Sequence, residues 1–207
     1  MSDYHTIVIG SGAGGLAAAV ALARAGRSVL VLEQHYLPGG WCHTFPLGGY
    51  QFSPGVHYIG ALNPGGHMRR IYEGLGVAND MTFNELNPDG YDHILIGDTQ
   101  FDIPSGKEKY RSRLHERFPS EAAGIDGYLD GCERMATELM RALPVKAPAE
   151  WLTLPWRIRH TVKDGLIPLD RYLDRFTKDP MLRAILTMQA GDHGVAPSRV
   201  PTIQHAA

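Results

Sequence analysis

The sequence has little cysteine and no long uninterrupted apolar run. Its two cysteines, Cys42 and Cys132, lie far apart and form no C-x-x-C pair. A disulfide framework and a cysteine-based zinc site are therefore not expected, and a reducing compartment is the simpler assumption. A membrane-spanning helix needs roughly 18 consecutive apolar residues without charge. The sequence contains no such run, so it predicts no spanning helix.

An excess of charge of one sign is also missing. The 20 basic and 22 acidic residues give a formal net charge of −2. This balance offers no overall attraction to nucleic acid, and we expect no nucleic-acid partner. The first residues lead into an apolar strand without the basic segment and cleavage site of a secretory signal. We therefore expect a cytoplasmic protein with at most a peripheral contact to a membrane.

A glycine turn stands near the start of the chain. The apolar run Thr6–Ile9 leads into G-S-G-A-G-G, with Gly10, Gly12 and Gly15 in the three positions of a G-x-G-x-x-G turn. Gly10 permits the tight turn, and Gly15 lets the following helix lie close to the strand. Gly12 puts no side chain between the backbone and a pyrophosphate. The turn therefore predicts a phosphate-binding loop.

A helix, a second strand and an acid follow the turn. Residues 16–23 place apolar side chains at helical spacing, Gly26 stands where a left-handed cap belongs, and the N-terminal end of such a helix favours an anion. Ser28–Leu32 is an apolar run typical of a parallel strand. It ends in Glu33, which is placed to accept hydrogen bonds from an adenosine ribose and would repel a 2′-phosphate. The pattern predicts an ADP-containing dinucleotide, and glycines that serve only packing are the alternative.

The next segment is rich in glycine and aromatic residues. Residues 34–66 hold eight glycines and six aromatic residues without a sustained helical period, which predicts an extended segment. The adjacent Gly39 and Gly40 would let the backbone run against the far side of a long dinucleotide, where side chains would collide. A plain turn after Pro38 is the alternative. Gly55, between Phe52 and Tyr58, is a second place where the chain can approach a flat ring.

Several stretches together resemble a known family. IGSGAGGLAAA, VLVLEQHYLPGGWCHTF and GYQFSPGVHYIG are similar to the flavoproteins that include phytoene desaturases, carotenoid isomerases and all-trans-retinol 13,14-reductases, and above all to the retinol-saturase-like branch. The resemblance continues through NPDGYDHILIGDTQFDIPSG and RFPSEAAGIDGYL, so it covers most of the chain. It implies FAD bound through the first β-α-β unit and a long isoprenoid or polyene substrate. It also implies that the three fingerprint glycines meet the pyrophosphate, Glu33 the ribose, and Gly40 the cofactor as part of the glycine doublet.

From the pattern and the resemblance together, a set of residues is expected at the cofactor. These residues are Gly10, Ser11, Gly12, Ala13, Gly14, Gly15, Glu33, Gln34, Gly39, Gly40, Trp41, Gly55, Val56 and His57. The catalytic residues are not assigned, apart from His57 as a candidate. A neutral imidazole at the ring end of the cofactor would hydrogen-bond the flavin edge or move a proton, while a histidine that satisfies loop carbonyls is an equal alternative.

The resemblance implies an FAD-dependent oxidoreductase that acts on carbon–carbon double bonds of a hydrophobic polyene such as a carotenoid or retinoid, with NAD(P)H considered as electron donor. An NAD-dependent dehydrogenase and a non-catalytic dinucleotide-binding fragment are the alternatives. The expected fold class is α/β: a Rossmann-like FAD-binding part over residues 1–66 and part of an α+β substrate lobe over residues 67–207. Because members of the family are longer than 207 residues, we expect a truncated chain.

The second part of the chain predicts short strands and helices. Strands are expected at Met81–Leu86, Tyr91–Ile96 and Gln100–Ile103, with turns between them. Helices are expected at His67–Leu75, Ser105–Phe118, Glu121–Leu143, Leu169–Phe176 and Pro180–Gln189. The last eleven residues are expected to be a tail that contains proline.

Other side chains have a structural interpretation as well as a functional one. The ten histidines lack the spacing of a familiar metal site, so no metal is expected. Cys42 is expected to be a small buried residue beside the cofactor. The basic residues of 107–117 are expected to form a solvated helix face. Trp151 and Trp156, close to two arginines, suit a membrane interface, with helix packing as the alternative.

Overall fold

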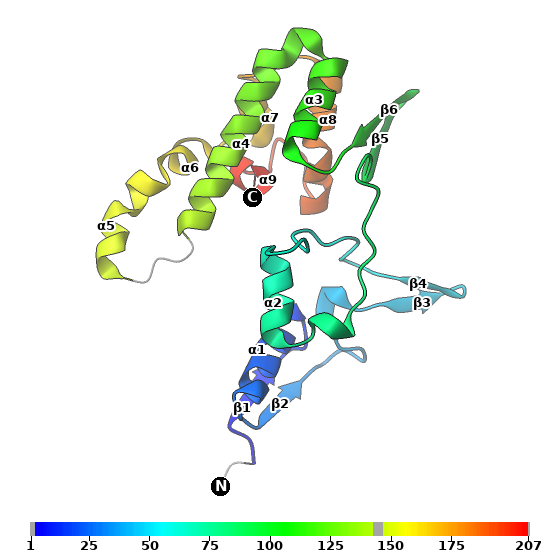
Figure 1. The fold of residues 1–207 in the computed structure, drawn as a ribbon, viewed down its shortest axis with the longest axis vertical. Helices are drawn as coiled ribbons and strands as arrows, with labels where there is room; N and C mark the ends of the chain where they lie inside the picture. Colours follow the sequence, from blue (N-terminus) through cyan, green and yellow to red (C-terminus); the bar gives the residue numbers. More distant parts are fainter. Residues whose placement is uncertain (1–2, 143–146, 207) are drawn as a thin grey trace. The chain divides into compact units, whose positions relative to one another are not determined.

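The computed structural model describes residues 3–142 and 147–206, and the chain divides into two compact units, Met1–Asn84 and Glu85–Ala207 (Figure 1). The division falls after Asn84 and not at the expected boundary between residues 66 and 67. Helix α2 (His67–Leu75) accounts for the difference, because it contacts α1 (Ala13–Arg24). The guanidinium at the end of α1 donates a hydrogen bond to the last carbonyl of α2 (3.3 Å).

The first unit begins with the expected β-α-β segment. Strands β1 (Thr6–Ile9) and β2 (Val29–Leu32) pair in parallel, with Thr6 opposite Val29, and α1 connects them. Gly26 follows α1 with a φ of 78°, as expected for a left-handed cap. Among the described residues this sheet has two strands. The predicted Rossmann-like start of the chain and its two parallel strands are confirmed.

A hairpin interrupts the glycine-rich segment that follows. Strands β3 (Phe45–Leu47) and β4 (Tyr50–Phe52) pair antiparallel. Gly48-Gly49 connects them with positive φ angles of 59° and 84°, which suits a two-residue hairpin turn. Single 3₁₀ turns lie at Gly40–Cys42 (η1) and Ala78–Asp80 (η2). The sequence predicted an extended segment without this hairpin, because strands of three residues leave little periodic signal.

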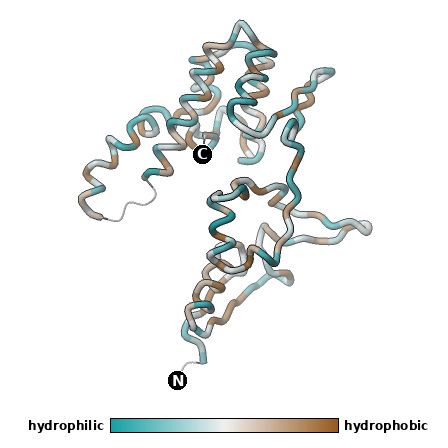
Figure 2. Tube along the Cα trace, in the orientation of Figure 1, coloured by the Kyte–Doolittle hydropathy of each residue, from teal (hydrophilic) through white to brown (hydrophobic). Residues whose placement is uncertain are grey.

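The second unit combines a strand hairpin with helices. Strands β5 (Asp92–Ile96) and β6 (Thr99–Ile103) pair antiparallel. The helices are α3 (Lys107–Arg117), α4 (Ala122–Ala142), α5 (Pro148–Arg157), α6 (Arg159–Asp164), α7 (Leu169–Leu173), α8 (Pro180–Thr187) and α9 (Thr202–Ala206), with 3₁₀ turns η3 (Pro119–Glu121) and η4 (Met188–His193). Hydrophobic and hydrophilic residues alternate along α4 and α8 (Figure 2). This pattern is typical of helices with one buried face.

The apolar core of the described residues lies in the second unit. Leu114, Ile125 and Leu182, from α3, α4 and α8, are fully buried, and the β5–β6 hairpin and α7 contribute further side chains. In β1 of the first unit, by contrast, the side chains of Ile7 and Ile9 are 57% and 87% exposed. The β1 strand therefore buries little apolar surface. Hydrogen bonds and close backbone contacts contribute more to the geometry of the β-α-β segment than they do in the second unit.

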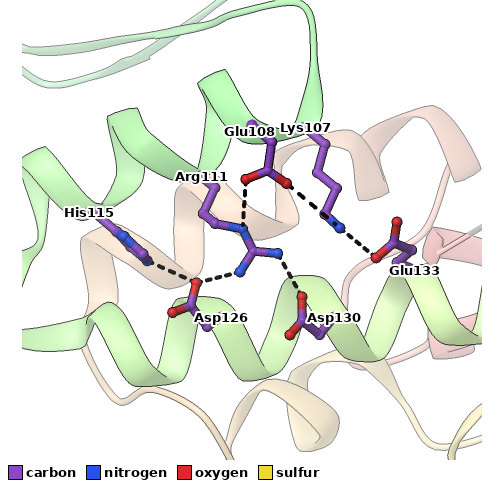
Figure 3. A network of polar contacts seen from close by, with 7 residues as sticks. All are labelled: Lys107, Glu108, Arg111, His115, Asp126, Asp130 and Glu133. Atoms are coloured by element: carbon purple, nitrogen blue, oxygen red, sulfur yellow. Dashed lines mark hydrogen bonds and ion pairs between the residues drawn. The ribbon is translucent and has the colours of Figure 1, made fainter.

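Ion pairs join α3 to α4 (Figure 3). Arg111 lies between Asp126 and Asp130, and its guanidinium is 2.6 Å from the Asp130 carboxylate. The hydrogen bond from Arg111 lowers the pKa of Asp126 below its ordinary value. Lys107 pairs with Glu133 at 2.5 Å. The expectation of a merely solvated basic face is therefore wrong for these two cations, because α4 supplies acids opposite them.

Several predicted boundaries need correction. Residues 81–86 form no strand, because they have no pairing partner among the described residues. The predicted helix over 121–143 is α4, and its last expected residue lies outside the described residues. Helices α5, α6 and α9 were not predicted. In α9, Thr202 donates hydrogen bonds from its amide and its hydroxyl to the carbonyl of Ile167 (2.9 and 2.7 Å), a tertiary contact that no local pattern reveals.

Candidate functional site

The glycine turn between β1 and α1 is held by close backbone contacts. Gly10 has a φ of 96°, and its amide donates to the carbonyl of Leu32 at the end of β2 (2.7 Å). A Cβ on Gly15 would lie 2.1 Å from the carbonyl oxygen of Gly10. Both glycines are therefore required by the fold itself: one by its left-handed backbone and the other by the close approach of α1.

Gly12 and Gly14 differ from the other two glycines. Gly12 has φ −65° and ψ 172°, which other residues adopt readily. No protein atom lies within 4 Å of the place that a Cβ would occupy on Gly12 or on Gly14. The protein's own packing therefore does not explain glycine at these positions, and open space remains beside the turn.

The open space lies at the N-terminal end of α1. No side chain caps this end, and the amide hydrogens of Gly14 and Gly15 have no hydrogen-bond acceptor among the described residues. Free amides and the positive end of the helix dipole favour an anion. The geometry thus fits the pyrophosphate of a dinucleotide, as the sequence predicted.

Glu33 fastens the turn to the end of β2. Its Oε2 accepts hydrogen bonds from the amide of Ser11 (2.7 Å) and from the Ser11 hydroxyl (2.6 Å). Its Oε1 accepts a hydrogen bond from the amide of His35 (2.8 Å). Glu33 therefore holds the loop through several hydrogen bonds, and its contact with a ribose stays a prediction.

These hydrogen bonds change the acidity of Glu33. The hydrogen bond from the Ser11 hydroxyl, followed by those from the amides of His35 and Ser11, lowers the pKa of Glu33 from 4.5 to about 2. The side chain is therefore a carboxylate at any neutral pH, and it would repel a 2′-phosphate on the ribose.

The Gly39–Gly40 doublet packs against the turn. The Gly39 amide donates to the carbonyl of Ser11 (2.9 Å), and Gly39 and Gly40 have φ angles of 116° and 56°. A Cβ on Gly40 would lie 3.0 Å from the Cα of Gly12. The protein's own packing thus suffices to explain the doublet, whose contact with a cofactor stays a prediction.

Four predicted residues follow the doublet along the segment. Trp41 is 76% exposed, and a Cβ on Gly55 would approach its Cβ to 3.1 Å. Val56 donates its amide to the hydroxyl of Ser53 (3.2 Å). His57 is exposed and forms no hydrogen bond or ion pair among the described residues. The structure thus connects Gly55 to the doublet through Trp41, and the role of His57 stays a prediction.

Other predicted side chains can now be placed. Ala13, at the start of α1, and Gln34, after Glu33, are both exposed. Cys42 is exposed as well, so its expected burial is wrong: the short turn η1 carries it on the surface. In the part of the chain that the structure describes, no group of three His, Cys, Asp or Glu side chains is placed to hold a metal ion.

Sequence reasoning missed the structural role of Ser11. It was included only as a cofactor contact, yet its side chain is 2% exposed and donates to Glu33. The signal in the sequence is weak: a small hydroxyl residue inside the glycine turn and an acid after the second strand. Only the parallel pairing of β1 and β2 brings the two side chains together.

The geometry of the turn defines a class of protein. Residues 8–75 match the family described as NAD(P)-binding Rossmann-like domain, so the first unit is a Rossmann-like dinucleotide-binding domain.

Over nearly its whole length the chain is also similar to particular proteins. It is 33% identical to all-trans-retinol 13,14-reductase of Danio rerio over 99% of this chain and 35% of the relative. It is 34% identical to the protein of that name from Rattus norvegicus, over 97% and 34%. It is 27% identical to prolycopene isomerase 1, chloroplastic, of an Oncidium hybrid cultivar, over 89% and 32%. The family resemblance found in the sequence is confirmed, and the chain spans about a third of the length of these relatives.

The two kinds of glycine predict different responses to alanine. Gly15→Ala should destabilise the β-α-β segment by about 1–3 kcal/mol, because its Cβ meets a backbone carbonyl that cannot move freely. Gly14→Ala is the matched control in the same turn, and it should change stability by less than about 1 kcal/mol. Hydrogen exchange of residues 6–33, measured by mass spectrometry without ligand, reports both values. Equal protection in the two variants would contradict the close contact.

The low pKa of Glu33 predicts a dependence of stability on pH. Because the folded-state pKa of about 2 lies below 4.5, the carboxylate stabilises the segment above about pH 4.5 and loses this effect as the pH falls towards 2. Glu33→Gln should weaken the segment at neutral pH and flatten this part of the profile. Glu73→Gln, which removes an exposed partner of Arg69, is the control and should keep the native profile. Denaturant unfolding across this pH range, with the Glu33 carboxyl signal followed by NMR, checks the prediction. A native-like profile for Glu33→Gln would refute it.

Proposed function

We propose that this chain is an FAD-dependent oxidoreductase, or the N-terminal part of one, that acts on carbon–carbon double bonds of a hydrophobic polyene. The observation that carries the proposal is the open space beside Gly12, at an uncapped helix end with the Glu33 carboxylate nearby. The printed names of the relatives, retinol reductases and prolycopene isomerases, support a retinoid- or carotenoid-like substrate. The relatives are named as a reductase and an isomerase, so the proposal specifies the double bond as the reacting group and not the direction of the reaction.

The chain's own residues would bind and orient the cofactor. The amides of Gly14 and Gly15 would donate to the pyrophosphate, since they have no acceptor of their own among the described residues. Glu33 would accept a hydrogen bond from a ribose hydroxyl while it keeps Ser11 in place. When bound, a flavin supplies the hydride or electron transfer that amino-acid side chains do not offer.

The segment after the doublet would face the ring end of the cofactor in this proposal. Trp41 presents a largely exposed indole, and Gly55 lets the backbone approach it closely. We keep His57 as the candidate for a hydrogen bond to the flavin edge or for proton transfer, because its imidazole is exposed and uncommitted to ion pairs in the described residues. NAD(P)H is proposed as the electron donor.

An NAD-dependent dehydrogenase is the second candidate. It is favoured by the description of the matching family as NAD(P)-binding, and Glu33 would bind the adenosine ribose of NAD in the same way. Parallel titration of one sample with FAD and with NAD separates the two proposals. Tight binding of NAD without binding of FAD would reject the FAD-dependent oxidoreductase and favour the NAD-dependent dehydrogenase. Binding of FAD without turnover of any polyene would favour a non-catalytic dinucleotide-binding role.

We also propose a cytoplasmic protein with a peripheral membrane contact. In the described residues no helix has the length and apolar character to cross a bilayer. Helix α5 nevertheless exposes Trp151 and Trp156, at 62% and 73%. Aromatic side chains of this kind favour the boundary between headgroups and acyl chains, where a hydrophobic substrate would be dissolved.

The open space beside Gly12 predicts a selective loss of cofactor binding. Gly12→Val should abolish measurable FAD binding, because the branched side chain occupies the path of the pyrophosphate, while the fold keeps its hydrogen-exchange protection. Gly74→Val is the control, since its Cβ also meets no protein atom within 4 Å but lies in α2. Fluorescence titration with FAD measures both. Native affinity in Gly12→Val would exclude a cofactor at this turn.

The exposed tryptophans predict a loss of vesicle binding. Trp151→Ser/Trp156→Ser should lower binding to phosphatidylcholine vesicles by about tenfold or more, because two large apolar contacts with the interface are removed. Trp41→Ser, which changes an equally exposed indole in the first unit, should leave vesicle binding unchanged. Co-sedimentation gives the bound fraction. No binding by the native chain, or no difference between the two variants, would remove the proposal.

A further inference from the structure

A pocket with many arginines lies where α4 meets α5 and α6. Its volume is about 300 Å³, and its lining includes Arg134, Arg141, Arg157 and Arg159. Arg134 and Arg141 belong to α4, while Arg157 ends α5 and Arg159 begins α6. Four arginines from three helices thus line one opening within the second unit.

The carboxylates of the pocket are already engaged by other groups. Glu133 pairs with Lys107 at 2.5 Å. Glu138 is buried and accepts hydrogen bonds from the amides of His160 (3.1 Å) and Thr161 (2.9 Å), and its Oε1 is 2.6 Å from the His160 ring. Both carboxylates thus have partners other than the four arginines, and with four arginines against two glutamates the lining is positive overall.

Three of the arginines have no carboxylate partner in the part of the chain that the structure describes. Arg134, Arg141 and Arg159 form no ion pair there, whereas Arg157 lies 3.8 Å from Glu150 and also donates to the carbonyl of Arg141. An excess of arginines in one lining attracts an anion, and a guanidinium group matches the geometry of phosphate oxygens. The charge of the lining therefore favours an anionic ligand such as a phosphate.

The position of Arg159 is fixed by the same contacts that engage Glu138. Because the Glu138 carboxylate accepts hydrogen bonds from the amides of His160 and Thr161, the first turn of α6 is attached to α4. The Arg159 guanidinium also lies 5.0 Å from the centre of the Trp156 ring. Arg159 thus belongs to the lining of the pocket and also contacts the exposed aromatic surface of α5.

The neighbouring surface of α5 is apolar. Trp151, Leu152 and Trp156 are 62%, 86% and 73% exposed, and Leu152 and Trp156, four residues apart, lie on one face of the helix. A free phosphate ion would gain nothing from these side chains. A lipid offers both chemistries together, with an anionic phosphate beside an apolar boundary.

We propose that the pocket formed by Arg134, Arg141, Arg157 and Arg159 binds the phosphate of an anionic lipid headgroup, while the apolar side of α5 enters the adjoining acyl boundary. The inference rests on the peripheral membrane contact proposed above and adds a selective headgroup site to it. With this site, the second unit would bind anionic membranes in preference to neutral ones.

Vesicles of two compositions test the headgroup site with the full chain. The native chain should bind vesicles of phosphatidylcholine with phosphatidic acid at least about tenfold more tightly than phosphatidylcholine alone, since each basic residue near such a surface adds to the attraction. Arg134→Gln/Arg141→Gln should remove most of this preference. Arg117→Gln/Arg199→Gln removes the same charge from exposed positions elsewhere in the second unit and should keep it. An equal loss in both double variants would mean non-specific attraction and overturn the proposal.

Further measurements distinguish the headgroup site from phosphate binding, from cofactor binding and from a membrane contact without headgroup preference. Calorimetry with inorganic phosphate tests the other source of the same chemistry: phosphate binding that Arg134→Gln/Arg141→Gln abolishes, without any preference for phosphatidic acid vesicles, would overturn the lipid assignment. FAD titration of the same variant should give the native affinity, so a failed cofactor proposal is recognised independently. Binding to neutral vesicles that depends on the tryptophans, without any anionic preference, would retain the membrane contact and reject the headgroup site.

Discussion

The hydrogen bonds between Ser11 and Glu33 are the constraint on which the geometry of the first unit depends. They attach the turn after β1 to the end of β2, and the Ser11 carbonyl in turn accepts the amide of Gly39. The open end of α1, the Glu33 carboxylate and the glycine doublet are thereby held close together. Two side chains of β1 are largely exposed, so little apolar burial holds this segment. The hydrogen bonds therefore contribute to its geometry what an apolar core contributes in larger sheets.

The glycines of the turn separate structural from ligand constraints. Gly10 needs its left-handed backbone, and Gly15 needs the absence of a Cβ beside a carbonyl oxygen. Gly12 has neither need within the protein, so a ligand is the simplest reason for glycine there. Gly40 lies between these cases, because its own packing against Gly12 already excludes a side chain. A glycine motif thus combines positions that the fold requires with positions that a ligand would require, and only the structure distinguishes the two.

The second unit uses charge to fix helices that its core does not fully orient. Arg111 and Lys107 attach α3 to acids of α4, and Glu138 attaches the start of α6 to α4. The pocket beside α5 is lined by four arginines and two glutamates, and both glutamates have other partners in the fold. Its positive character is therefore a local excess of arginine, which the overall charge of −2 does not reveal.

The sequence by itself determined the β-α-β start, the glycine turn, the cap at Gly26 and α2 with its end at Gly76, because these depend on short-range periodicity and on glycine's backbone freedom. It also carried the family resemblance. Only the tertiary structure decided that Ser11 faces Glu33, that residues 81–86 remain unpaired, and that arginines of α4 and α6 share a pocket. Such facts depend on contacts between residues distant in sequence, and local patterns do not encode which partner a strand, an acid or an arginine will meet.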